Sequence, residues 1–140
     1  MTEQPKDLPK GLLALRVSVF LVMAMWTLDK FARPEHAGKV YEAFYFLPGL
    51  GKGVLLVVGI AEAALLVGFL AGYRKRLTYG LVLLLHAVST LSSFRQYLAP
   101  FDKGNLLFFA AWPMLAACWA LYLLRDHDVL WTVERAKTEG

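Results

Sequence analysis

Cysteine is almost missing from this chain of 140 residues. Its single cysteine, Cys118, lies in an apolar run near the carboxyl terminus. Thiol–disulfide exchange needs a second thiol, so the sequence excludes a disulfide-generating enzyme that relies on its own cysteine pair.

Metal ligands at helical spacing are missing as well. Within the apolar runs, no two residues of the types His, Cys, Asp and Glu stand three or four positions apart, the spacing that places two ligands on one helix face. Haem ligation by two histidines is disfavoured, because His36 and His127 lie in polar flanks and only His86 lies in an apolar run. We therefore expect no metal site.

Charged residues are scarce, and apolar residues take their place. Charged residues make up 19% of the chain, hydrophobic residues make up 58%, and the mean hydropathy is +0.49. This is too apolar for a soluble domain. A hydrocarbon core about 30 Å thick needs about 20 apolar residues per helix, and four such runs are present. They are Gly11–Leu28, Gly53–Tyr73, Leu77–Leu98 and Asn105–Leu124.

The length of the runs and of the links between them predicts the fold class. Runs of this length are about twice as long as a barrel strand, so we expect helices. The short "RKR" link predicts an antiparallel hairpin of the second and third helices, and Pro113 should kink the fourth. The prediction is an all-α integral membrane four-helix up-down bundle over residues 11–124, with cytoplasmic tails at 1–10 and 125–140.

Positive charge is divided unevenly between the two predicted membrane faces. Nine of the fifteen Lys and Arg residues lie on the side of both termini, and six lie on the other side. Cytoplasmic loops carry the excess of Lys and Arg. We therefore expect a multi-pass membrane protein with both termini in the cytoplasm.

The loop between the first two predicted spans is amphipathic. In "PEHAGKVYEAFYFLP", residues 34–48, one side of a helix would carry Glu35, Lys39 and Glu42. The other side would carry Val40, Phe44 and Leu47. The pattern predicts a short helix at the outer membrane interface, acting as a lid or an anchor.

The stretch "LHAVSTLSSFRQ", residues 85–96, is unusually polar for a membrane helix. At 100° per residue its polar side chains fall on one face, which can point into the bundle while leucines face lipid. This stripe comprises Tyr79, His86, Ser89, Thr90, Ser93, Gln96 and Tyr97. Arg95 falls on the opposite side, where it can reach the headgroups or turn toward Asp29 of the first helix.

Two ionisable residues are expected deep in the membrane. Glu62 lies about 15 Å along the second helix at 1.5 Å per residue, and His86 is similarly deep on the third. We expect Glu62 and His86 to pair. The pair would be either a structural hydrogen bond between helices or a site that relays protons or hydrogen-bonds a quinone.

Further candidate site residues lie around this pair and at the outer edge. Trp26, Asp29 and Lys30 form either a pocket mouth or an aromatic belt with interfacial charges. The candidate cofactor-binding residues are Trp26, Ser89, Ser93, Gln96 and Tyr97. The candidate ion pair at the outer end involves Asp29, Lys30 and Arg95.

Two segments carry a family resemblance. These are "LDKF" at the end of the first span and "GIAEAALLVGFLAGYRKRLTYGLVLLLHAVST", with Gly59, Glu62, Gly68 and the basic turn Arg74–Arg76. Over residues 12–124 the chain resembles the DoxX-like small membrane proteins. The resemblance implies a four-helix bundle of the bacterial cytoplasmic (inner) membrane, associated with a redox, quinone-linked membrane complex.

These features support a function hypothesis and two alternatives. We expect a DoxX-like accessory, non-catalytic subunit of a membrane oxidoreductase system, with quinone as its candidate cofactor. Its partners would be the lipid bilayer, other membrane or periplasmic redox subunits, or further copies of itself. The alternatives are a small proton or solute transport protein and an assembly scaffold. Nucleic acid is not expected, because the charge of +4 comes from residues that flank spans.

Overall fold

The computed structural model describes residues 3–135, and over this range the chain is helical with no strand. The longer helices are α1 (Leu8–Ala32), α3 (Lys52–Leu70), α4 (Lys75–Ser92) and α6 (Ala111–Leu123). The shorter ones are α2 (Pro34–Tyr45), α5 (Phe94–Leu98), and the 3-10 segments η1 (Asn105–Ala110) and η2 (Arg125–His127). The predicted all-α class is confirmed.

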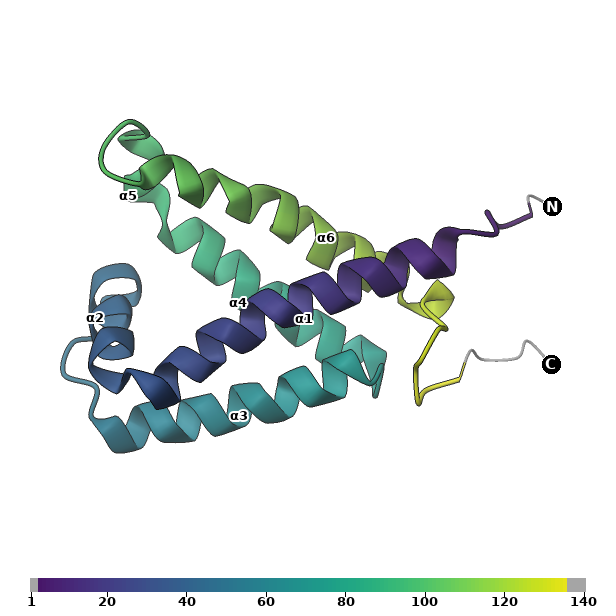
Figure 1. The fold of residues 1–140 in the computed structure, drawn as a ribbon, viewed down its shortest axis with the longest axis horizontal. Helices are drawn as coiled ribbons and strands as arrows, with labels where there is room; N and C mark the ends of the chain where they lie inside the picture. The colour runs from purple at the N-terminus through teal and green to yellow at the C-terminus, as the bar shows by residue number, and fades with distance from the viewer. Residues whose placement is uncertain (1–2, 136–140) are drawn as a thin grey trace.

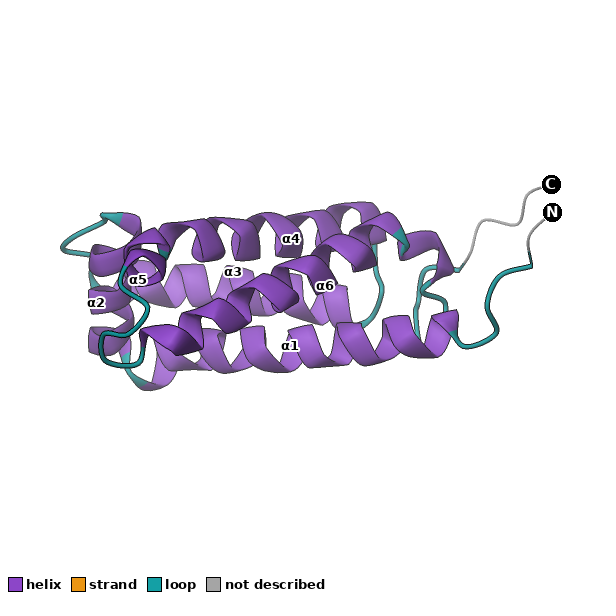
Figure 2. Ribbon diagram, turned by 90° about the horizontal axis from the view of Figure 1, so that it is seen from above, coloured by secondary structure: helices purple, strands orange, loops and turns teal. Residues whose placement is uncertain are grey.

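The four longer helices surround one core. α1 packs against α3 and α6, and α4 packs against the same two helices. α1 begins, α3 turns into α4, and α6 ends at one end of the bundle, which we call the terminal end (Figure 1). α2 and α5 lie at the opposite end, called here the α2 end (Figures 1 and 2).

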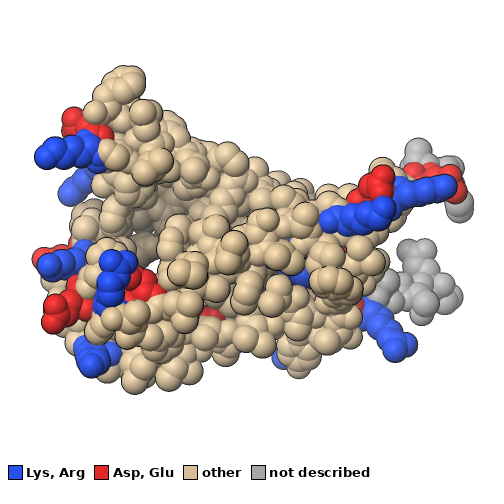
Figure 3. Space-filling view, in the orientation of Figure 1, with Lys and Arg blue, Asp and Glu red and all other residues tan. Residues whose placement is uncertain are grey.

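The apolar surface is consistent with a membrane protein. Three helical segments are long and apolar enough to cross a membrane, namely Leu8–Ala32, Lys52–Leu70 and Asn105–Leu123. On the face shown in Figure 3, charged side chains gather at the two ends, and the surface between them is largely uncharged. Large apolar side chains such as Leu21, Val57 and Val67 are exposed between these ends, as expected where lipid replaces water.

The polar stretch makes α4 different from the other long helices. α4 is not among the three apolar segments, and the predicted span Leu77–Leu98 is divided into α4 and α5. Thr90, Ser92 and Ser93 each donate a hydrogen bond to the backbone carbonyl four residues earlier. Such bonds compete with the helical ladder and bend helices. The prediction of a single helix was therefore wrong at this point.

The polar stripe nevertheless points inward as predicted. Tyr79, His86, Thr90 and Ser93 are all buried. The opposite face of α4 exposes Leu81, Leu84, Val88 and Leu91. This arrangement lets α4 keep its polar groups within the bundle while its leucines remain on the surface.

The link between α3 and α4 forms a tight antiparallel turn. Gly72 has a positive φ of 62°, and the N–H of Tyr73 donates to the Gly68 carbonyl at 2.8 Å. A residue in this left-handed conformation commonly ends a helix, and glycine adopts it without steric cost. The predicted hairpin is thereby formed. In the fourth helix, the 3-10 segment η1 lies just before Pro113, where the proline lacks the N–H of a regular helix.

The predicted amphipathic helix is present as α2. Ala37 is buried, and Val40, Tyr41 and Phe44 are half-buried against the bundle. The hydroxyls of Tyr45 and Ser89 lie 2.6 Å apart and connect α2 to α4. The outward face carries Glu35, Lys39 and Glu42, as predicted. Leu47, expected on the apolar face, follows the helix and is exposed.

Residues 125–135, predicted as part of a cytoplasmic tail, pack against the bundle. The N–H of Val133 donates to the Ala71 carbonyl at 2.8 Å, and the N–H of Glu134 donates to the Gly72 carbonyl at 3.3 Å. Asp128 is completely buried. The remainder of the predicted tail, residues 136–140, lies outside the described residues.

Candidate functional site

Glu62 is held by α1 and not by α4. Its Oε2 accepts hydrogen bonds from Lys30 Nζ at 2.8 Å and from Thr27 Oγ1 at 3.1 Å. The side chains of Lys30 and Glu62 are 10% and 21% exposed, so the ion pair is largely withdrawn from the surface. We call Thr27, Lys30, Tyr41 and Glu62 the α2-end cluster.

Tyr41 places an aromatic ring over this ion pair. Lys30 Nζ lies 5.7 Å from the ring centroid, close enough for a cation–π contact. Burial, together with the negative charge of Glu62, raises the pKa of Tyr41 to about 12. The phenol therefore stays protonated at physiological pH and can donate a hydrogen bond.

His86 has different neighbours. Its Nε2 lies 3.0 Å from the Ala111 carbonyl oxygen and 3.3 Å from Thr90 Oγ1. A carbonyl can only accept, so Nε2 carries the proton of this bond. Nδ1 is buried and has no hydrogen-bond partner among the described residues. The Trp26 ring stacks on the imidazole, with centroids 6.1 Å apart and planes at 24°.

The expected pair of Glu62 with His86 is therefore wrong as a contact. α1 lies against α3 along much of its length, and the long Lys30 side chain reaches Glu62 from near the end of α1. Glu62 and His86 nevertheless contact neighbouring residues of α1. Trp26 stacks on His86, and the next residue, Thr27, donates to Glu62.

The candidate cofactor-binding residues are mostly engaged with protein groups. Ser89 bonds Tyr45, and Ser93 Oγ donates to the Ser89 carbonyl at 3.2 Å. Tyr97 donates to the Thr90 carbonyl at 2.8 Å. Gln96 Oε1 is buried without a hydrogen-bond partner among the described residues, like His86 Nδ1. The fifth candidate, Trp26, is about half exposed.

The three residues expected to form an ion pair at the outer end do not meet. Asp29 accepts from Arg33, whose Nη2 lies 2.6 Å from Oδ1, and its Oδ2 lies 2.6 Å from His36 Nδ1. Lys30 binds Glu62, as described above. Arg95 instead lies over the Phe46 ring, 5.4 Å from its centroid. Arg33 is one helical turn from Asp29, so it supplies the nearest positive charge.

A second ionic cluster, which sequence reasoning missed, lies at the terminal end. Arg16 is 1% exposed, and its Nη1 lies 2.7 Å from Asp128 Oδ1. Tyr79 donates to Asp128 Oδ2 at 2.6 Å, and Lys75 Nζ donates to the Asp128 carbonyl at 2.6 Å. Glu134 accepts from the Lys75 N–H at 2.7 Å. We call these five residues the terminal-end cluster.

The signal for this cluster was present in α1. Arg16 shares a helix face with the buried residues Leu12, Val19 and Met23, at the spacing of three or four that a core face shows. An arginine on such a face needs a carboxylate partner. Asp128 lies far along the chain, in the segment predicted as a cytoplasmic tail, so no local pattern pairs the two residues.

No group of three or more His, Cys, Asp or Glu residues in range 3–135 could hold a metal ion. Comparison with known proteins finds no matching family model, curated protein or solved structure. Function is therefore inferred from the arrangement of the chain itself.

Proposed function

We propose that this chain is a DoxX-like protein of the bacterial cytoplasmic membrane, in which α4 spans the bilayer together with the three apolar segments. The 18 residues of α4 extend about 27 Å, close to the thickness of the hydrocarbon core. Its inward polar face and exposed leucines support a span shielded by neighbouring helices. An even number of spans places both termini on one side, the cytoplasmic side by the positive-charge rule.

Within that membrane protein we propose a quinone-contacting, non-catalytic role in a redox complex. The observation that carries this proposal is the partnerless Nδ1 of His86 in a buried position. With Nε2 protonated toward Ala111, the neutral imidazole offers Nδ1 as an acceptor, which suits the hydroxyl of a quinol. An unsatisfied buried polar atom is costly, so a ligand that supplies a donor there binds favourably.

The surroundings of His86 suit a planar ring with a lipophilic tail. Trp26 covers one face of the imidazole and keeps about half of its own surface free for stacking. Thr27, the residue after Trp26, donates to Glu62, so the carboxylate that pairs with Lys30 is held by the same turn of α1 that carries Trp26. In this arrangement the charges of the α2-end cluster would set the electrostatic potential near the quinol. His86 would make the direct hydrogen bond to the quinol hydroxyl.

Quinone content tests this function. The protein is purified in mild detergent, and bound quinone is extracted and quantified by mass spectrometry for wild type, His86→Leu and the matched control His36→Leu. His36 lies on α2 and pairs with Asp29. We expect quinone per protein to fall at least about fivefold in His86→Leu, since a lost hydrogen bond in a buried site costs about 1–3 kcal/mol. It should stay near the wild-type level in His36→Leu. A wild-type protein without quinone, or equal quinone in both variants, would refute the proposal.

An assembly role is the second candidate, and α2 favours it. Its outward residues Glu35, Lys39 and Glu42 are exposed at the α2 end. Cross-linking in native membranes from Lys39 would identify a partner subunit at this helix. A transport role has less support, because most of the polar stripe is bonded to protein groups and not left to line a wet path.

A further inference from the structure

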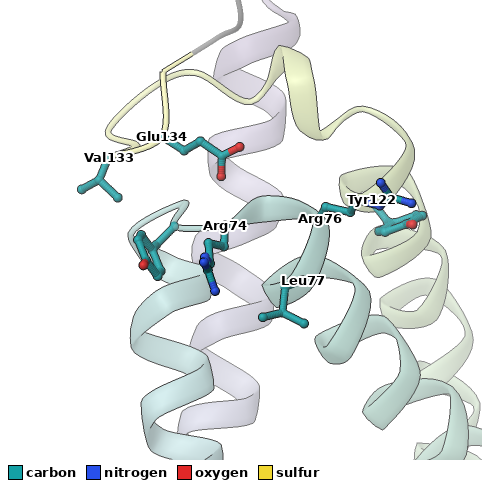
Figure 4. Close-up of a pocket in the computed structure, with 7 residues that line it drawn as sticks. Arg74, Arg76, Leu77, Tyr122, Val133 and Glu134 are labelled. Atoms are coloured by element: carbon teal, nitrogen blue, oxygen red, sulfur yellow. The ribbon is translucent and has the colours of Figure 1, made fainter.

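A groove of about 690 Å³ lies at the terminal end, between the α3–α4 turn, the end of α6 and the carboxyl-terminal segment. Figure 4 shows Arg74 on the turn, Arg76 at the start of α4, Tyr122 on the α6 side and Glu134 on the returning segment. This groove is separate from His86 and from the α2-end cluster, which lie toward the other end of the bundle.

The three consecutive basic residues Arg74–Arg76, where α3 turns into α4, differ in burial. Lys75 is buried, with its ammonium bound to the Asp128 carbonyl. Arg74 and Arg76 remain exposed and line the groove. Arg74 has a φ of 45°, so the turn is in the left-handed conformation at this point and the chain changes direction there. The turn and the start of α4 thus present two guanidinium groups in a stretch of three residues.

The groove is basic at its rim and apolar below. Glu134 is the sole acid among its lining residues, and one of its oxygens already accepts the Lys75 N–H. Arg125 stacks on Tyr122, 4.7 Å from the ring centroid, and adds a third positive charge beside the groove. Leu77, about half exposed, continues the groove toward the uncharged middle of the molecule.

We propose that this groove binds the phosphate headgroup of an anionic phospholipid from the adjacent leaflet. Guanidinium groups donate two parallel hydrogen bonds to phosphate oxygens, and clusters of basic residues beside a span attract anionic lipids. Leu77 and the apolar face below it take the acyl chains. The proposal depends on the membrane embedding proposed above, and it is independent of quinone binding.

Lipid retention measured by native mass spectrometry tests this site. The protein is released from nanodiscs of equal phosphatidylglycerol and phosphatidylcholine, and the retained lipids are compared for wild type, Arg74→Gln/Arg76→Gln and a control. The control Lys39→Gln/Lys103→Gln removes the same charge at the α2 end. We expect preferential phosphatidylglycerol retention by wild type, a loss of about fivefold per arginine removed, and a change below about twofold in the control.

A third variant separates charge from shape. Glu134→Gln keeps an oxygen that accepts the Lys75 N–H but removes the negative charge of the groove. Phosphatidylglycerol retention should rise several-fold. If the double arginine variant unfolds, as judged by circular dichroism, Arg76→Gln alone replaces it, with an expected loss of about fivefold.

Three outcomes would overturn the proposal. The first is equal retention of the two lipids by wild type, and the second is unchanged preference in the arginine variants. The third is displacement of phosphatidylglycerol by inorganic phosphate at equal concentration, which would make this a site for the free anion. Recovery of the wild-type chain in carbonate-washed membranes is measured separately, so a failure of membrane embedding is distinguishable from a failure of this site.

Discussion

Removing the charge of Asp128 should weaken the packing of residues 125–135 against the bundle. Asp128 is completely buried and faces the equally buried Arg16, at 2.7 Å between Oδ1 and Nη1. Asp128→Asn keeps the shape of the side chain and an oxygen for the Tyr79 hydroxyl. It leaves the guanidinium of Arg16 without its counter-charge inside the protein.

The expected magnitude follows from the burial of both groups. Removing one partner of a buried ion pair costs about 3–5 kcal/mol, because the remaining charge is uncompensated in a medium that solvates it poorly. Arg16 keeps its hydrogen bond to the Leu130 carbonyl at 2.6 Å, which places the estimate nearer 3 kcal/mol. Replacing both partners, as in Arg16→Met/Asp128→Asn, should cost less than the two single changes added together.

A double-mutant cycle measures this coupling. The free energy of unfolding in detergent micelles is compared for wild type, both single variants and the double variant, with Asp126→Asn as the control. Asp126 lies two residues away and is exposed, so its substitution should change stability by less than about 0.5 kcal/mol. Hydrogen exchange should also rise within residues 125–135 in Asp128→Asn. A cost within 1 kcal/mol of the control, or unchanged exchange there, would refute the reasoning.

Three further predictions concern contacts between helices, each measured by thermal unfolding in the same micelles. Glu62→Gln should cost about 1–3 kcal/mol because Lys30 loses its charged partner, and Lys30→Met/Glu62→Gln should recover part of that cost. A double variant less stable than Glu62→Gln would contradict this. Tyr45→Phe should cost about 1 kcal/mol and speed hydrogen exchange in α2 but not in α3; equal changes in both helices would count against it. Gly59→Val should cost about 1–3 kcal/mol, because a Cβ there would lie 2.8 Å from Phe31 Cζ. Adding Phe31→Ala should restore stability, and a double variant no more stable than Gly59→Val would contradict this.

The terminal-end cluster also changes how the basic residues are interpreted. Arg16 and Lys75 are two of the nine positive charges on the predicted cytoplasmic side, and both are buried and bound to Asp128. Their role in the folded protein is to hold the carboxyl-terminal segment against α1 and α4. Arg74 and Arg76 are exposed and can contact lipid headgroups. The proposed lipid site therefore depends on these two residues.

Local properties of the sequence determined most of the secondary structure. Run length and composition located the long helices, and the amphipathic pattern of residues 34–48 located α2. The 100° spacing along α4 correctly placed His86 and Thr90 on an inward face. These features depend on residues within a few helical turns of one another. The local amino-acid sequence is therefore sufficient to predict them.

Tertiary structure alone decided which charges meet. Glu62 pairs with Lys30 and not with His86, because the pairing depends on the depth and rotation of α1 against α3 and on the reach of a lysine side chain. Asp128 pairs with Arg16 because the segment after α6 folds back over the terminal end. Helix periodicity fixes the face on which a residue lies. The partner of a buried charge is fixed by the packing of segments distant in sequence, and hydropathy carries no record of that packing.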